Sequence, residues 1–255
     1  MKKLDENTKV LTLENAYKLE NSQITKFEVQ SNQTLTIIEI ISDDTELSKE
    51  LIVGENATLN YIKIGTKENS ANRNYTNTIA KNGTLNLTLL EYGSSQNSIN
   101  TKLNCDDSTF TINGLLDLKD DAKVSYDVQT NHQAKSTSDV AFKNLLDGKS
   151  FVKLNMFSIV ENNASFSKAF QNSKTILLSD DSSIAVTPHL EISIDELEAS
   201  HGATCGDLDK DSIYYLQSRG ISEDDAKKIV LDAIRDEVVA SVDNEQLSEY
   251  IKGLL

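Results

Sequence analysis

The segments ATLNYIKI (57–64), TLNLTLL (84–90) and TFTINGLLDL (109–118) decide the fold of this chain. In each of them apolar residues alternate with polar ones after a polar turn, which is the period-two pattern of a strand with one buried face. The same unit recurs from about residue 34 to residue 193, mostly at one or two multiples of about a dozen residues. Its turns are Glu55-Asn56, Asn82-Gly83, Asp106-Asp107, Asp120-Asp121, Asp147-Gly148, Asn162-Asn163 and Asp180-Asp181.

Units of a turn and a strand at a regular spacing are typical of a solenoid whose coils stack in register. A β-sandwich would use similar strands, but hairpin signals are scarce in this sequence. We therefore predict a mainly β fold, with a parallel β-helix as the core over residues 34–206. Residues 1–33 give only weak, mixed signals and form an N-terminal segment without a predicted structure.

Near Asp207 the period of the apolar residues changes from two to 3.6, which predicts a small α-helical domain over residues 207–255. Asp209 can cap a first helix, and Gly220 can end it in the left-handed conformation. Ser222 with Asp225 forms a capping box for a second helix. The apolar stripe of that helix consists of Ala226, Ile229, Val230, Ala233, Ile234 and Val238.

A third helix is predicted to begin at Asp243 with Gln246. The residues on its apolar face are Leu247, Tyr250, Ile251 and Leu254.

The composition restricts the class of protein. With 40 acidic and 25 basic residues the net charge is −15, which would repel a phosphate backbone and argues against nucleic acid as a partner. No apolar stretch approaches the roughly 18 residues that a membrane span needs, and the N-terminal segment lacks the apolar core of a secretory signal. Two cysteines exclude a disulfide framework, so we predict a soluble, cytoplasmic protein.

The junction between the strands and the helices carries the most specific motifs. It reads PHLEISIDELEASHGATCGDLDKDSIYYLQSRGISEDDAKKIV (188–230). This segment resembles the C-terminal signature of the SufB/SufD family of iron–sulfur cluster assembly proteins. The resemblance rests on PHLEI (188–192), SHGAT (200–204), YLQSRG (215–220) and the acidic helix start after Ile221-Ser222, and a fainter likeness extends it to roughly residues 100–240.

The resemblance implies a right-handed parallel β-helix followed by a small helical domain, in agreement with the two-part organisation predicted from periodicity. It also implies a complex in which two β-helix subunits pair and each docks its C-terminal helices on a SufC-type ATPase. The expected partners are this ATPase and either a SufB-like subunit or a second copy of the chain. A transient iron–sulfur cluster is expected at the interface of the β-helices, and a flavin participates in some relatives. Family members carry a long N-terminal helical region, which is expected here to be absent or cut to a few residues.

Two positions place the chain within the family. SufB-like members carry His-Glu in the turn and a cysteine on an upstream strand, whereas SufD-like members carry His-Gly. Here the turn holds His201-Gly202, and QNSK (171–174) stands where the upstream cysteine is expected. The chain is therefore identified as SufD-like, and we expect a scaffold or partner subunit and not a free-standing enzyme.

His201 is the leading candidate for cluster or metal binding, because a neutral imidazole is a good ligand for iron and the residue lies in the matching motif. The alternative is a turn histidine that bonds to the backbone. Cys205 follows four residues later, where a loop could bring a thiolate and an imidazole to one iron. A merely buried cysteine is the alternative there. His132, His189 and Cys105 are weaker candidates for which structural roles are favoured.

The helical domain is the predicted ATPase-binding surface. Large rings and a forked cation are enriched in interface hot spots, and this mixture occurs at the end of the first predicted helix. The candidate contact residues are Tyr214, Tyr215, Leu216, Arg219 and Gly220. No P-loop occurs in the sequence, so nucleotide is expected to bind to a separate subunit.

Two alternatives to a cluster scaffold remain open. In the first, the chain binds no cluster and only regulates or recruits the ATPase. In the second, it is a β-helix enzyme that acts on polysaccharides through paired carboxylates such as Asp120-Asp121. Adjacent strand residues face opposite ways and Asp is common in turns, so the paired carboxylates are better explained as turn residues.

Overall fold

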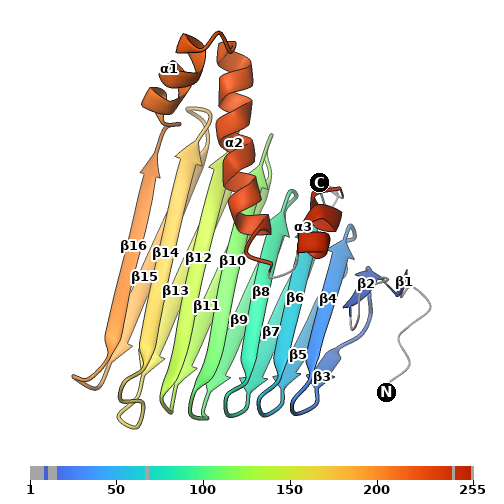
Figure 1. Cartoon of the computed structure of the whole chain (residues 1–255), viewed down its shortest axis with the longest axis vertical. Helices are drawn as coiled ribbons and strands as arrows, with labels where there is room; N and C mark the ends of the chain where they lie inside the picture. The colour runs from blue at the N-terminus through green and yellow to red at the C-terminus, as the bar shows by residue number, and fades with distance from the viewer. Residues whose placement is uncertain (1–8, 11–15, 67–68, 243–244, 254–255) are drawn as a thin grey trace.

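The computed structural model describes residues 9–10, 16–66, 69–242 and 245–253, which form two β-sheets and three helices (Figure 1). The first sheet, here called sheet A, contains β1 (Lys9–Val10), β2 (Ala16–Glu20), β4 (Thr34–Ile41), β6 (Thr58–Gly65), β8 (Thr84–Glu91), β10 (Ser108–Leu118), β12 (Ser136–Leu146), β14 (Lys168–Leu177) and β16 (Glu198–Gly206). The second, sheet B, contains β3 (Lys26–Val29), β5 (Leu47–Val53), β7 (Asn72–Ile79), β9 (Ser95–Leu103), β11 (Lys123–His132), β13 (Phe151–Val160) and β15 (Ser183–Ile192).

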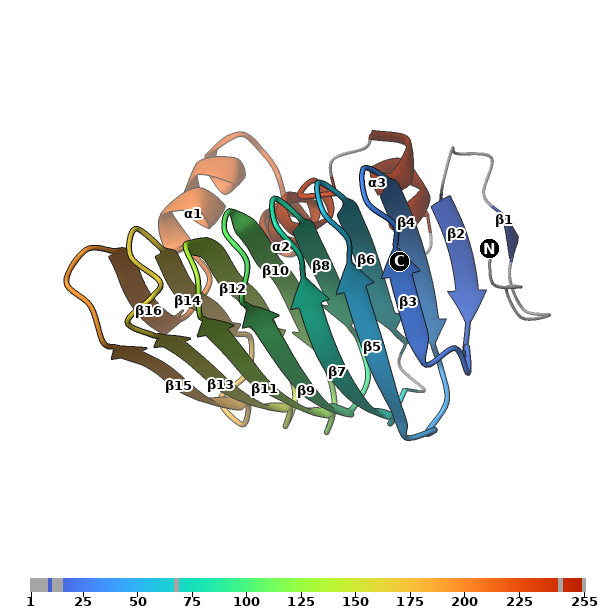
Figure 2. The same ribbon diagram turned by 90° about the horizontal axis from the view of Figure 1, so that it is seen from below.

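Successive strands alternate between the two sheets, so each coil of the chain adds one strand to sheet A and one to sheet B (Figure 2). Within each sheet the coils pair in parallel, apart from the antiparallel pair of β1 and β2. Thr34 lies beside Thr58, 24 residues later, and Thr137 lies beside Lys168, 31 residues later, so the coils are longer in the second half of the solenoid. The predicted parallel β-helix is therefore confirmed, and strands β2 and β3 extend the two sheets into the segment before residue 34.

The turns before the strands of sheet A form a ladder of their own. Asn32, Asn56 and Asn82 each adopt a positive φ, between 54° and 60°, two residues before a strand begins. Asparagine tolerates this left-handed conformation better than most residues. The side-chain amide of Asn82 donates to the carbonyl of Asn56 (2.9 Å), and Asn56 donates to Asn32 (3.3 Å). The polar turns therefore stack from coil to coil, as their spacing in the sequence predicts.

Three helices follow the last strand: α1 lies beyond the C-terminal end of β16, and α2 and α3 lie over the outer face of sheet A (Figures 1 and 2). They are α1 (Lys210–Ser218), α2 (Glu223–Val239) and α3 (Glu245–Lys252). The predicted caps are confirmed: Asp209 accepts from the first turn of α1, Gly220 has a φ of +88°, and Ser222 accepts from the backbone N–H of Asp225. Asp243 and Leu254, predicted in the third helix, lie outside the described residues. No helix in the described ranges is long and apolar enough to cross a membrane.

The strands of sheet A are buried on both faces where the helices cover them. Ile62 and Leu115 point out of the solenoid and pack in one cluster with Val238, Leu247 and Ile251 of the helical region. The prediction of one buried face per strand is therefore wrong for the second half of these strands. The reason is physical: the helices exclude water from an outer surface that a solenoid alone would expose.

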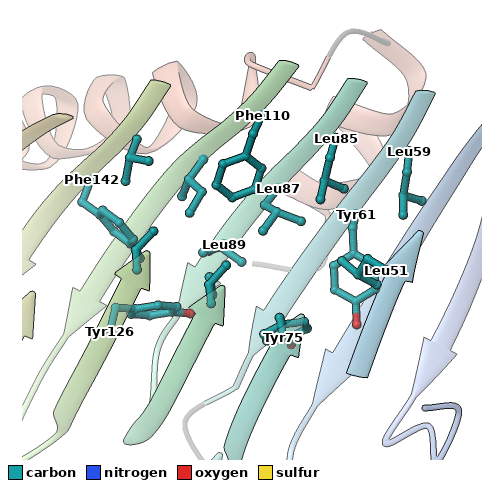
Figure 3. Close-up of a cluster of buried hydrophobic side chains, with 14 of the residues drawn as sticks. Leu51, Leu59, Tyr61, Tyr75, Leu85, Leu87, Leu89, Phe110, Tyr126 and Phe142 are labelled. Atoms are coloured by element: carbon teal, nitrogen blue, oxygen red, sulfur yellow. The ribbon is translucent and has the colours of Figure 1, made fainter. Parts of the chain in front are cut away.

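The interior of the coils is filled by side chains from both sheets, as Figure 3 shows for Leu85, Leu87, Phe110, Tyr126 and Phe142. Phe142 lies beside Gly114 in the ladder, and a Cβ atom on that glycine would be 2.2 Å from the ring. Glycine at position 114 is therefore what lets the ring of Phe142 lie across the neighbouring coil.

Two fully buried ion pairs lie in the interior of the solenoid, one between neighbouring coils of sheet A and one between the two sheets within a coil. Lys63 Nζ lies 2.5 Å from Glu91 Oε1, which also accepts from the hydroxyl of Tyr126. Lys49 Nζ lies 2.8 Å from Glu39 Oε1. Burial lowers the pKa of Lys63, and the Glu91 carboxylate opposes that shift. A buried charge without its partner is costly, so these pairs favour the observed stacking of coils over shifted arrangements.

We predict that Lys63→Met destabilises the protein strongly, because it leaves the Glu91 carboxylate buried without its counter-ion. The free energy of unfolding should fall by about 3–5 kcal/mol. Adding Glu91→Leu to that variant should restore most of the loss, since an apolar pair of similar volume avoids the buried charge. Urea unfolding followed by circular dichroism measures both effects.

The matched control is Lys135→Met, which removes the exposed ion pair between Lys135 and Asp107. It should leave the unfolding midpoint almost unchanged. Equal losses in the single and the double interior variant would contradict the proposed role of the buried pair.

Candidate functional site at the open end of the solenoid

The C-terminal end of the solenoid presents two strands that each pair on one side only. Strand β16 ends sheet A beside β14, and β15 ends sheet B beside β13. Among the described residues no further strand covers this end, which we call the open end (Figure 1). Inward-facing positions of β16 are therefore exposed, although the same positions in earlier coils are buried.

The ladder places His201 at the open end. His201 lies beside Gln171, which lies beside Val140 and then Ile112, and these three earlier residues are buried in the solenoid. His201 thus continues a row of inward-facing residues, but its side chain is exposed because no coil follows it. An accessible imidazole on a rigid strand is suited to binding a metal ion or a transferred group.

Cys205 is on the same strand and is also exposed. A strand rises about 3.3 Å per residue, so four residues separate the backbones of Cys205 and His201 by roughly 13 Å. The predicted loop that would bring both side chains to one iron is replaced here by an extended strand. The structure therefore does not bring these two candidates together.

Cys205 instead lines a groove of about 860 Å³ between the end of sheet A and helices α1 and α2. Its apolar wall includes Ile176, Leu216 and Ile229, and its rim carries Asp209 and Glu237. Ile229 is 46 % exposed, so the apolar stripe predicted for the second helix is only partly covered by the solenoid.

The interior next to the open end carries uncharged polar side chains, whereas the earlier coils hold the large apolar cluster and the two buried ion pairs. Gln171 is buried, and its amide nitrogen donates to Ser158 Oγ (2.8 Å) and to the carbonyl of His189 (3.1 Å). Asn144 donates in the same way to Ser173 and Thr175. The side-chain carbonyl oxygens of both Gln171 and Asn144 have no partner within the described part of the chain. The sequence analysis did not assign these amides to the site. Both lie at positions that alternate in step with the buried residues of their strands, which could have identified them as inward-facing.

The other two histidines have structural surroundings. Both ring nitrogens of His132 lie within hydrogen-bond distance of serine hydroxyls, Ser136 Oγ at 2.8 Å and Ser138 Oγ at 2.9 Å. Burial lowers the pKa of His132 to about 4. His189 stacks on Phe157 at 4.3 Å on the outer face of sheet B. Cys105 lies in the turn before β10, far along the solenoid from β16.

The candidate partner residues on α1 are accessible. Tyr214 and Tyr215 are 77 % and 60 % exposed. The guanidinium of Arg219 lies over the ring of Tyr215 at 5.3 Å and reaches its hydroxyl at 3.3 Å. This contact holds the ring and the cation together on one exposed surface, while Leu216 faces the groove and Gly220 ends the helix.

No group of three or more His, Cys, Asp or Glu side chains in the described ranges is arranged to hold a metal ion. His201 could supply one ligand, so a complete coordination shell would need donors from elsewhere.

Comparison with protein families agrees with this architecture. A family model described as "SUF system FeS cluster assembly, SufBD core domain" matches residues 14–234. The chain belongs to the SufB/SufD family.

Individual SufB/SufD relatives match over parts of their length. Iron–sulfur cluster assembly protein SufD of Escherichia coli K12 is 26 % identical over 157 residues, which cover 61 % of this chain and 37 % of the relative. The protein of that name from Plasmodium falciparum is 32 % identical over 140 residues, 54 % of this chain and 10 % of the relative. The one from Bacillus subtilis is 34 % identical over 96 residues, 38 % of this chain and 21 % of the relative. The chain thus spans well under half of each of these relatives.

We predict that the stability of this SufB/SufD-family protein falls between pH 7 and pH 5.5 because of His132. The folded state keeps His132 neutral with a pKa of about 4, whereas an unfolded histidine takes up a proton near pH 6.5. The unfolded state therefore binds more protons as the pH falls below 6.5, and stability should decrease by about 1 kcal/mol per pH unit. Urea unfolding at several pH values measures this slope.

The slope should flatten in His132→Gln and persist in the surface control His189→Asn. An unchanged slope in His132→Gln would assign the pH dependence to other groups.

Proposed function

We propose that this chain is a non-catalytic scaffold subunit in iron–sulfur cluster assembly. It works with a SufC-type ATPase and with a second β-solenoid chain, either SufB-like or a second copy of itself. The observation that carries the proposal is an exposed His201 on the open end of a SufB/SufD-family solenoid. The names of the relatives supply the process, since three of them are called iron–sulfur cluster assembly proteins.

The open end supports pairing with a second chain. Edge strands expose backbone N–H and C=O groups that readily pair with another strand. Both β15 and β16 are such edges, and both are nine or ten residues long. A second solenoid that pairs with them would cover the exposed inward-facing positions of β16, among them His201 and Cys205.

Pairing would also complete the chemistry of the site. One histidine is too few ligands for an iron centre, and a facing chain is the natural source of the others. In this arrangement His201 holds iron or sulfur for a cluster that is cargo and is later passed on. Cys205 lies about 13 Å away along the strand and serves as a separate, secondary donor.

Docking of the ATPase is assigned to α1. The surface formed by Tyr214, Tyr215 and Arg219 has the composition of an interface hot spot. It lies beyond the C-terminal end of β16, whereas the stacked asparagine turns lie at the other ends of the strands of sheet A (Figure 1). The apolar groove beneath it offers a neighbouring pocket for an inserted side chain. Energy from nucleotide hydrolysis would reach the open end through α1, which follows β16 directly in the chain.

We expect His201→Ala to reduce cluster assembly by the purified complex at least tenfold while leaving the fold intact, because the side chain is exposed. Anaerobic reconstitution with iron and sulfide, followed by visible absorbance, measures the effect. His189→Asn on the outer face of sheet B is the control and should assemble cluster normally. Unchanged assembly in His201→Ala would favour the alternative in which the chain only recruits the ATPase.

We expect Tyr215→Ala combined with Arg219→Ala to abolish co-purification with a SufC-type ATPase. Both side chains are exposed and contact each other, so their loss removes the surface without opening the core. Lys227→Ala on the exposed side of α2 is the control. Retention of the ATPase by the double variant would move the docking surface away from α1.

A further inference from the structure

The outer face of sheet B carries a small pocket that the proposed function does not use. Figure 2 shows the three described helices on the side of sheet A, so none of them covers the outer face of sheet B. The pocket has a volume of about 220 Å³ and lies across β9, β11 and β13. It opens to solvent, so the chemistry of its walls decides which ligand it can hold.

One row of outward-facing side chains is interrupted at this pocket. The ladder places Asn100, Gln129 and Phe157 next to one another across three strands. Gln129 turns along its own strand, where its Nε2 donates to Asn131 Oδ1 (3.2 Å). A slot therefore remains above β11, between walls whose backbones are two strand spacings, roughly 10 Å, apart. A planar group in contact with both walls needs roughly 7–8 Å, twice a carbon–carbon contact, so the slot fits a flat group.

Phe157 lines one wall of the slot with an aromatic face. Its opposite face is covered by His189, which stacks on it at 4.3 Å with an angle of 8° between the ring planes. His189 belongs to β15, which lies on the other side of β13 from the pocket. The face of Phe157 toward β11 is therefore available for stacking. The face of an aromatic ring attracts cations, and planar cations stack on it best.

The polar groups around the slot are mainly hydrogen-bond acceptors. Asp127 is exposed, and its one side-chain partner in the described part of the chain is the amide of Asn155, which donates to it. The side-chain carbonyl oxygen of Asn100 is buried and has no partner there. The χ2 torsion of asparagine is soft, so a rotation of this amide turns its oxygen into the slot. The pocket thus suits a ligand that donates hydrogen bonds, and an anion would meet the carboxylate of Asp127.

We propose that this pocket binds a guanidinium group. A guanidinium is planar and permanently charged, and it carries five N–H donors and no acceptor. Its plane would lie against the free face of Phe157, and its edge would donate to Asp127 and Asn100. An ammonium group has the charge without the flat shape, so it would satisfy Asp127 but leave the slot unfilled.

Two lysines outside the pocket bear on the source of the guanidinium. Lys102 and Lys153 are exposed and lie two residues from Asn100 and Asn155 along their strands, a rise of about 7 Å. Their repulsion of a cation in the slot is weak, because water and salt screen exposed charges. They are placed to contact a carboxylate of the same ligand. Free arginine has such a carboxylate and an arginine within a polypeptide does not, so the two sources differ in a measurable way.

Titration of the nitrogen-15-labelled chain with L-arginine, followed by two-dimensional NMR, tests the site. The backbone amides of Asn100, Gln129 and Phe157 should shift together and saturate. Asp127→Asn should weaken binding roughly tenfold, because it removes the charge and keeps the oxygen that accepts from Asn155. Phe157→Leu should weaken binding about threefold through the loss of the ring face.

The matched control variant is Asp121→Asn, which removes the same charge from an exposed turn outside the pocket and should bind like the wild type. L-lysine has the charge and the carboxylate of arginine without the planar head, and it should bind roughly tenfold more weakly. N-acetyl-L-arginine amide separates the two sources. Equal or tighter binding of this probe would assign the site to an arginine of a polypeptide, and weaker binding would assign it to free arginine.

Three results would overturn the inference. The first is that L-arginine leaves the amides of Asn100, Gln129 and Phe157 unshifted. The second is that L-lysine, or the Asp127→Asn variant with L-arginine, gives the wild-type response, which would reduce the effect to general attraction by an acidic protein. The third is that AMP binds at these amides more tightly than L-arginine, which would make a nucleobase the occupant. None of these results bears on the open end or on α1, so the proposed function is tested separately.

Discussion

The parallel backbone ladder between successive coils fixes the position of every other group in this protein. Because each residue lies beside one residue of the next coil, side chains far apart in the sequence form rows. A shift of one residue would turn a whole strand's inward set outward. Lys63 could then no longer meet Glu91, and the ring of Phe142 would lose the space above Gly114. The charged interior therefore depends on the ladder and at the same time restricts it to one register.

The same ladder explains why the candidate site lies where the solenoid ends. Ile112 and Val140 occupy inward-facing positions that are buried. His201 occupies the corresponding position on β16, and its side chain is accessible because no coil follows β16 among the described residues. A functional side chain at this place needs no loop or cleft of its own. The preceding coils position it, because β16 is paired along its length with β14.

The sequence was sufficient for the parts of the fold that depend on local chemistry. The stacked turns, the β-helix, and the caps at Asp209 and Ser222 follow from residue types at fixed spacings. It was insufficient where distant segments meet. Ile62 and Leu115 broke the period of two because helices more than a hundred residues later cover them. Glu91 was in phase with Leu85 and Leu87, but only the neighbouring coil reveals Lys63 as its partner. The separation of His201 from Cys205 likewise required knowing that the segment between them is a strand.

Two kinds of departure from the regular pattern occur in this chain, and they have different consequences. Glu39, Lys49, Lys63 and Glu91 are charges in the core, and each finds its counter-ion within the chain, so their role is complete in the isolated protein. Phe166 is a strained and exposed ring, and His201 is an exposed inward position, and the described chain gives neither a comparable partner. The φ of Phe166 is +64°, and asparagine, which the earlier turns carry at this place, tolerates the left-handed conformation better than phenylalanine does. Both groups lie in the last two coils, next to the edge strands β15 and β16, which have no further strand beside them among the described residues.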